Sequence, residues 1–201
     1  MQIIGGTGSG KTSFTKRLLK NAETMVDPPF QKTIWAYGEW QPAYENMTGV
    51  HFVKGLNEDV VKRENLNGHS CLVIDDLSDE IDAKLLGALF TKISHHRNLS
   101  IIFLLNNIFY KGVSTMRLVS LNTHYLVLFK TPRDQDSINT IARQMFGKDY
   151  KIMAEAYRDA TKEKYGYLIV DSKPDSPEAI RLRTAVFDER PICYIISNGK
   201  K

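Results

Sequence analysis

A glycine-rich run near the start of the chain constrains the fold more than any other feature of the sequence. Residues 5–12 read GGTGSGKT, between the apolar residues QII and the helix-forming stretch SFTKRLLK. They match the pattern G-x-x-x-x-G-K-[ST], in which glycines let the backbone wrap so that successive N–H groups point inward. A helix that begins at such a loop directs its positive end toward the same point. The run therefore predicts a strand, a phosphate-binding P-loop and a helix in direct succession.

The P-loop pattern assigns chemistry to individual residues. Lys11 is expected to reach the β- and γ-phosphates of a nucleotide and to act in catalysis, and the Thr12 hydroxyl is expected to bind Mg²⁺. The predicted cofactors are therefore ATP and Mg²⁺. The candidate nucleotide-binding residues are Thr7, Gly8, Ser9, Gly10, Lys11, Thr12 and Ser13.

Apolar runs alternate with amphipathic helical patterns up to about residue 150. The predicted strands are residues 2–5, 33–37, 51–53, 71–75, 101–105 and 125–129. Helices are predicted over 79–95 and from Thr131, which is expected to cap a helix that has Pro132 at its first position. This alternation predicts an α/β fold of the P-loop NTPase type, with a mostly parallel central sheet and helices on both faces.

The end of the chain follows a different pattern. A charged helix is expected over about 151–164, followed by the apolar runs YGYLIVD, IRLRTAVF and PICYIIS, which polar turns separate. We interpret these runs as antiparallel strands that extend one edge of the sheet. Residues 1–201 are thus expected to form a single P-loop ATPase domain, with a nucleotide-binding core over 1–150 and a helix-and-strand extension over 151–201.

The composition is that of a soluble globular protein. Hydrophobic residues make up 42% of the chain and charged residues 25%, and the net charge is +4. Cys71 and Cys193 provide neither a disulfide framework nor metal-ligand spacing, and both are expected to be small buried residues. Because no run approaches the length of a membrane span and no signal peptide is visible, a non-secreted protein in a reducing compartment is expected.

Two adjacent carboxylates stand at the end of the buried strand predicted at 71–75: Asp75 is its last residue and Asp76 follows it. P-loop enzymes hold Mg²⁺ with a carboxylate on a strand next to the P-loop, and Asp75 is placed to do so. Asp76 is expected to orient or deprotonate the attacking water, a role typical of ATPases that drive mechanical work. The alternative is that Asp76 caps a helix that starts near Ser78.

Polar and basic residues flank the next predicted strand. Asn106 follows it and is expected to sense the γ-phosphate or the attacking water, ahead of Asn107, although asparagine also favours turns. Hydrolysis at a subunit interface would need an added positive charge, for which Arg97 and Arg117 are the candidates. For each arginine alone, a solvated surface position is the simpler interpretation.

These residues together resemble the viral genome-packaging ATPases of the FtsK/HerA superfamily. The resemblance rests on the Asp75–Asp76 pair, on HHRNLSIIFLLNNIF and on SLNTHYLVLFKTPRDQDSINTIARQMFG, with support from YGEWQPAY and RLRTAVF. The poxvirus-type packaging ATPases, with their relatives in Polinton/adintovirus-like elements and virophages, are the most similar group. The resemblance implies a RecA/FtsK-like motor that pumps double-stranded DNA into a viral capsid.

The resemblance also implies partners and a place of action. It implies a homo-oligomeric ring, with a hexamer favoured and a pentamer possible, that meets capsid or portal-vertex proteins without a membrane. The site of action is then the infected host cell (its cytoplasm or viral factory), the virion, or both. Asn106 stands where the family has glutamine as its polar sensor. Asparagine keeps the amide group, but its shorter side chain does not reach as far. An arginine finger acting in trans is expected, and Arg117 is favoured over Arg97.

A ring motor grips the DNA backbone with basic side chains and reads no sequence. The candidates are Lys54, Lys111, Lys130 and Arg133, and the loop 108–116 follows the sensor strand closely enough to respond to nucleotide. Glu39, Trp40 and Gln41 are expected to act near the nucleotide or at a subunit contact. The alternative is that Trp40 anchors its loop in the core and that Glu39 is solvated. His95 and His96 are expected to be structural.

Two other functions remain open from the sequence. A P-loop kinase of a nucleoside or another small molecule would use the same loop and has a similar size, but it usually carries an arginine-rich lid. The third interpretation is an inactive relative that serves as an assembly factor, against which the intact Lys11, Thr12, Asp75 and Asp76 argue.

Overall fold

The computed structural model describes residues 1–66, 68–77, 80–107, 114–132 and 135–195. The chain divides into two compact units. Unit 1 holds Met1–Gln2, Lys11–Leu105 and the described residues 114–123. Unit 2 holds Ile3–Gly10, residues 106–107 and the described residues from His124 onward. Strand β1 (Gln2–Ile4) therefore contributes residues to both units.

Unit 1 contains a parallel sheet. Its strands are β2 (Lys32–Tyr37), β3 (Val50–Lys54), β4 (Ser70–Asp75) and β5 (Leu99–Leu105), in the order β3-β2-β4-β5. Every residue of β4 is buried, as expected for a strand covered on both faces. Tyr37 lies opposite Asp75 in the register, so β2 and β4 end at the same edge of the sheet.

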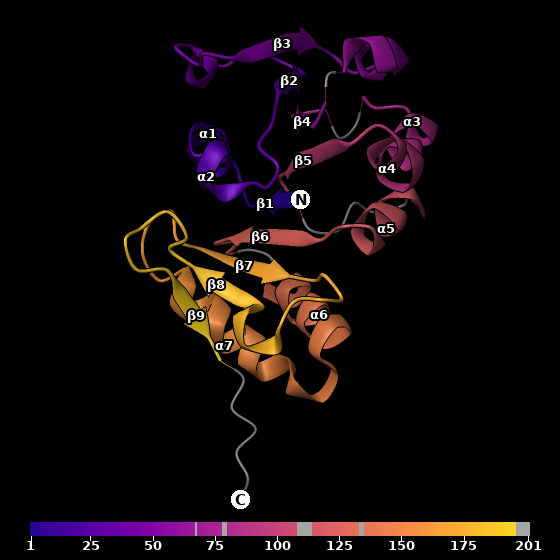
Figure 1. Ribbon diagram of the computed structural model, residues 1–201. Helices are drawn as coiled ribbons and strands as arrows, with labels where there is room; N and C mark the ends of the chain where they lie inside the picture. Colours follow the sequence, from indigo (N-terminus) through magenta and orange to yellow (C-terminus); the bar gives the residue numbers. More distant parts are fainter. Residues whose placement is uncertain (67, 78–79, 108–113, 133–134, 196–201) are drawn as a thin grey trace, which may run out of the picture. The chain divides into compact units, whose positions relative to one another are not determined.

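Helices cover both faces of this sheet (Figure 1). α1 (Lys11–Lys20) and α2 (Ala22–Met25) lie on one face, and α3 (Ala83–Ala88), α4 (Ser94–His96) and α5 (Ser114–Leu121) lie on the other. A π-helical turn, Leu89–Ile93, joins α3 to α4, and short 3₁₀ turns occupy Pro42–Tyr44, Glu58–Val61 and Arg63–Asn65. The described part of the helix predicted over 79–95 is thus a chain of three segments that ends at His96.

Unit 2 contains antiparallel strands. β6 (Tyr125–Phe129), β7 (Tyr167–Asp171), β8 (Leu182–Thr184) and β9 (Ile192–Tyr194) pair in chain order. α6 (Gln135–Phe146) leads through a 3₁₀ turn (Gly147–Asp149) into α7 (Tyr150–Ala160), and another such turn (Glu178–Ile180) precedes β8. Arg183 forms an ion pair with the buried carboxylate of Asp171 at 2.6 Å, which ties β8 to β7.

The structure confirms an α/β fold with the predicted strands, parallel in unit 1 and antiparallel at the end of the chain. The first helical position predicted for the second helix is wrong: Pro132 lies in a turn, and the described helix α6 spans Gln135–Phe146. The Thr131 hydroxyl lies 3.2 Å from the Tyr157 hydroxyl, and the residues that it is predicted to cap lie outside the described residues. None of the described helices is both long and apolar enough to cross a membrane. The P-loop type of the fold and its single-domain organisation stay predictions.

Candidate functional site

The glycine-rich loop lies between β1 and α1, as its pattern predicts. Gly8 and Gly10 have φ angles of 76° and 110°, which residues with a side chain rarely adopt. A Cβ atom on Gly5 would come within 2.6 Å of the Phe129 Cβ atom, so this position also requires glycine. The Ser9 hydroxyl is buried and has no hydrogen-bond partner in the described part of the chain. The loop thus has a tightly turned backbone, and the Ser9 hydroxyl is available to bond a ligand.

Lys11 is the first residue of α1 and is only 9% exposed. Burial lowers the pKa of its ammonium group, and the negative charges of Asp75 and Asp76 act in the opposite direction. The ammonium group therefore lies within electrostatic reach of both carboxylates. Thr12, the next residue, is half-buried, whereas Thr7 and Ser13 are exposed.

Asp75 ends β4 and is 5% exposed. Burial raises the pKa of its carboxyl group, which the Tyr44 hydrogen bond and the Lys11 charge oppose. The Tyr44 hydroxyl donates a hydrogen bond of 2.8 Å to Asp75 Oδ2. The nearby Trp35 indole N–H also lowers the pKa of Asp75. The two groups do not meet hydrogen-bond geometry, and this buried N–H has no hydrogen-bond partner among the described residues.

Asp76 follows with a left-handed backbone, φ 56°, and an exposed side chain. The Gly38 N–H donates to the Asp75 carbonyl, and a Cβ atom on Gly38 would come within 2.4 Å of the Asp76 carbonyl oxygen. Glycine at position 38 therefore lets the end of β2 approach the acidic pair. Asp82, not Asp76, caps α3, through a hydrogen bond to the Leu85 N–H.

Beside the acidic pair lies a cluster of aromatic rings that sequence reasoning did not find. Trp40 contacts Tyr37, Tyr44 and Phe52 at ring-centroid distances of 5.3–5.4 Å, and Trp35 packs against Tyr44 and Phe52. Trp40 remains 50% exposed, so the prediction that it anchors its loop in the core is wrong. The aromatic composition of YGEWQPAY is the sequence signal for this cluster, but it does not identify Tyr44 as the partner of Asp75.

The remaining catalytic candidates have different surroundings. Asn106 and Asn107 are exposed directly after β5 and belong to unit 2, so a role for Asn106 at the carboxylates of unit 1 stays a prediction. Arg97 donates a hydrogen bond to the Val61 carbonyl, which binds its guanidinium within unit 1. Arg117 is exposed on α5.

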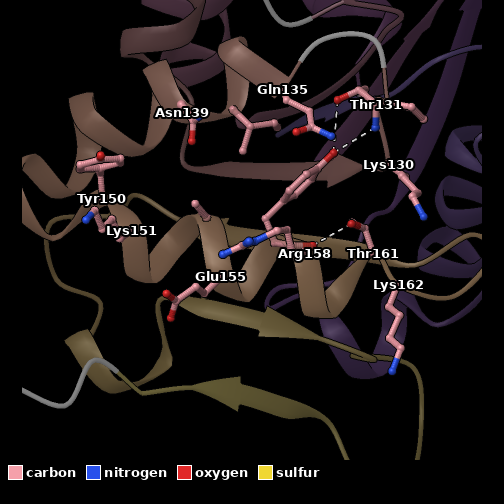
Figure 2. A pocket seen from close by; sticks show the side chains of 14 residues that line it. Lys130, Thr131, Gln135, Asn139, Tyr150, Lys151, Glu155, Arg158, Thr161 and Lys162 are labelled. Carbon is pink, nitrogen blue, oxygen red and sulfur yellow. Dashed lines mark hydrogen bonds between the residues drawn. The ribbon is translucent and has the colours of Figure 1, made fainter.

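The two DNA-contact candidates that the structure describes belong to different units. Lys54 forms an exposed ion pair with Glu39 at 3.3 Å. Lys130 lines a pocket of about 590 Å³ in unit 2, shown in Figure 2. Lys111, Arg133 and most of the loop 108–116 lie outside the described residues.

The cysteines and histidines give no sign of a metal centre. Cys71 is buried as predicted, whereas Cys193 is exposed on β9, so its predicted burial is wrong. His95 and His96 are exposed on α4. Among the described residues, no group of three or more His, Cys, Asp or Glu side chains is arranged to hold a metal ion.

Comparison with known proteins finds a solved structure with a similar fold. No model of a known protein family matches the sequence, and no curated protein matches it either. The cytoplasmic domain of the Type VII secretion ATPase EccC from Thermomonospora curvata has a similar structure, with a TM-score of 0.58 and 13% sequence identity. The match covers 100% of this chain, which spans 26% of the length of the EccC chain. At this identity the match shows a similar fold alone.

Proposed function

We propose that this protein is an ATPase that couples hydrolysis of ATP to the movement of double-stranded DNA, as one subunit of a ring that packages a viral genome. One observation carries the proposal: Lys11, at the end of a P-loop sequence, lies within electrostatic reach of Asp75 and Asp76 at the end of a buried strand. A cation for phosphates and two carboxylates for a metal and a water are the groups that phosphoryl transfer to water requires.

The donor set fits ATP with Mg²⁺. The unpartnered Ser9 hydroxyl and the backbone of a loop wound by Gly8 and Gly10 are suited to phosphate oxygens. The Thr12 hydroxyl and the Asp75 carboxylate are oxygen ligands of the kind that Mg²⁺ takes, with water and phosphate completing its shell. Such an ion, when bound, neutralises charge on the transferring phosphate.

Each of the proposed site residues then has a distinct role. Lys11 binds the phosphates, and its buried position strengthens the attraction because water is excluded. Asp76, exposed next to the buried Asp75, holds or accepts a proton from the attacking water. Arg117 is better placed than Arg97 to serve a neighbouring subunit, because it is exposed whereas Arg97 is bound to the Val61 carbonyl.

Two further points support a motor. Hydrolytic motors usually carry a second acidic residue after the metal ligand, as Asp76 does here, whereas small-molecule kinases generally lack it. The similar solved structure carries the name of an ATPase. The resemblance of the sequence to packaging ATPases adds the substrate, double-stranded DNA, and the capsid as partner.

The test is the rate of ATP hydrolysis with and without duplex DNA at low salt, since phosphate contacts weaken steeply as salt rises. The proposal predicts hydrolysis that duplexes of unrelated sequence stimulate equally and that Lys11→Ala abolishes. Hydrolysis that ignores DNA, with phosphate transferred to a nucleoside, would replace the proposal with a P-loop kinase.

A further inference from the structure

A pocket between α6 and α7 of unit 2 carries an excess of positive charge. Its volume is about 590 Å³, within the range of ligand-binding clefts. The basic residues that line it are Lys130, Lys151, Arg158 and Lys162, and Glu155 is its acidic residue. Figure 2 shows Lys130 and Lys162 at one end and Lys151 at the other. All four basic side chains are exposed, so the positive charge faces solvent along the pocket.

The buried hydroxyl groups of the pocket form hydrogen bonds within the protein. The Tyr157 hydroxyl donates to the Phe129 carbonyl and accepts from the Thr131 N–H, each at 2.9 Å. The Thr161 hydroxyl donates to the Tyr157 carbonyl at 2.7 Å. Apolar atoms of Ile138 and Ala154 line the pocket as well. Since these deep groups are satisfied, the pocket offers a ligand its rim of charges more than a set of converging hydrogen bonds.

Two of the charges lie on one helix, and a third follows its end. Lys151 and Arg158 are spaced by seven residues, which places them on one face of α7, and Lys162 lies two residues beyond the end of this helix at Ala160. The seven residues from Lys151 to Arg158 span about 10 Å at the helical rise of 1.5 Å. One DNA strand advances about 3.4 Å per phosphate along the duplex axis, so these two side chains are spaced by about three nucleotides, and Lys162 lies at the end of the pocket away from Lys151 (Figure 2). A row of exposed cations of this length matches a repeating polyanion better than a single compact anion.

We infer that the α6–α7 pocket, which we name the basic groove, binds the sugar–phosphate backbone of double-stranded DNA. The inference rests on the proposed function and adds a contact surface that the P-loop residues do not supply. Binding through exposed lysine and arginine charges is independent of base sequence. Glu155 lies within the line and limits how closely phosphates approach its centre, which directs them to the two ends.

The test compares two triple variants of the whole protein with equal loss of charge. The groove variant carries Lys151→Gln, Arg158→Gln and Lys162→Gln. The matched control carries Lys20→Gln, Lys84→Gln and Lys92→Gln, three exposed lysines of unit 1. Binding of a fluorescein-labelled duplex is followed by anisotropy over a range of salt concentrations. Circular dichroism and thermal unfolding establish that both variants fold.

The groove variant is expected to bind DNA at least about tenfold more weakly and to flatten the dependence of log K on log salt by up to about three, because each lost phosphate contact removes about one counterion. Its hydrolysis of ATP without DNA stays at the level of the wild type, and its stimulation by DNA falls. The control is expected to change binding less than about twofold.

Four results would overturn the inference. Equal weakening in both variants would assign binding to net charge and not to the groove. Undiminished DNA binding by the groove variant, with DNA still stimulating hydrolysis, would show that the groove does not bind DNA and would leave the proposed function in place. Absence of DNA binding by the wild-type protein would contradict both the groove inference and the proposed function. Binding of ATP to Lys11→Ala protein that the groove substitutions abolish would assign the groove to a free nucleotide instead of DNA.

Discussion

The Tyr44 hydroxyl donates a hydrogen bond of 2.8 Å to the Asp75 carboxylate, and the side chains of both residues are almost completely buried. Tyr44 ends the short turn Pro42–Tyr44, whose Ala43 carbonyl accepts a 2.6 Å hydrogen bond from the Lys16 ammonium group of α1. The turn is therefore held on one side by the helix that follows the glycine-rich loop and on the other by the end of β4. This arrangement makes Tyr44 a positioning residue for the proposed metal ligand.

Replacing Tyr44 with phenylalanine tests that role. Tyr44→Phe keeps the ring and its packing but leaves Asp75 without its hydroxyl donor, so we expect the free energy of unfolding to fall by about 1–3 kcal/mol. We also expect hydrolysis to require a several-fold higher Mg²⁺ concentration for half-maximal rate, because the carboxylate is no longer fixed. Denaturant unfolding and a Mg²⁺ titration at saturating ATP measure the two effects.

Tyr37→Phe is the matched control, because Tyr37 belongs to the same aromatic cluster and its hydroxyl is not bonded to Asp75. It is expected to change neither the Mg²⁺ requirement nor the unfolding free energy by a comparable amount. A Tyr44→Phe protein that is less stable but has an unchanged Mg²⁺ requirement would reduce Tyr44 to a purely structural role.

Asp76→Asn separates hydrolysis from nucleotide binding. Asparagine has nearly the same size and tolerates the left-handed backbone at this position, so the fold should be retained. Loss of the carboxylate that acts on water is expected to lower kcat by about 10²–10⁴, with ATP affinity within a few fold of the wild type. Binding of a fluorescent ATP analogue and a phosphate-release assay measure the two quantities. Unchanged hydrolysis in the Asp76→Asn protein would remove Asp76 from the catalytic groups.

The two cysteines provide a test of burial. Burial raises the pKa of the Cys71 thiol to about 12, so this thiol stays protonated and unreactive in the folded protein, whereas Cys193 is exposed. We expect a thiol reagent at neutral pH to modify the native wild-type protein rapidly at one site and the native Cys193→Ser protein hardly at all. Both proteins should react fully in denaturant. Rapid modification of native Cys193→Ser protein would contradict the burial of β4.

Elements whose signal is local were predictable from the sequence. Residues 71–74 are continuously apolar, as expected for a strand such as β4 that is buried on both faces, and the loop at 5–12 has a spacing that predicts a strand before it and a helix after it. The acidic pair was predictable for the same reason, since Asp75 ends the strand and Asp76 directly follows it. These features depend on residues close together in the chain.

Features that depend on distant residues were not predictable. The backbone N–H and hydroxyl of Thr131 contact the hydroxyl of Tyr157, which is 26 residues away and which no local pattern identifies. Cys193 lies in an apolar run, yet β9 pairs with β8 alone among the described strands and exposes this side chain. Tyr44 reaches Asp75 across 31 residues, and no spacing rule in YGEWQPAY indicates that contact.

The most direct test of the proposed function is whether ATP hydrolysis moves the protein along DNA. A third DNA strand bound in triplex to one end of a duplex is displaced when a translocating protein reaches it, and its release is followed by fluorescence. The account predicts release that requires ATP and Mg²⁺, that does not depend on duplex sequence, and that is absent with Lys11→Ala protein. A third strand that stays bound while the wild-type protein hydrolyses ATP in the presence of the duplex would contradict it.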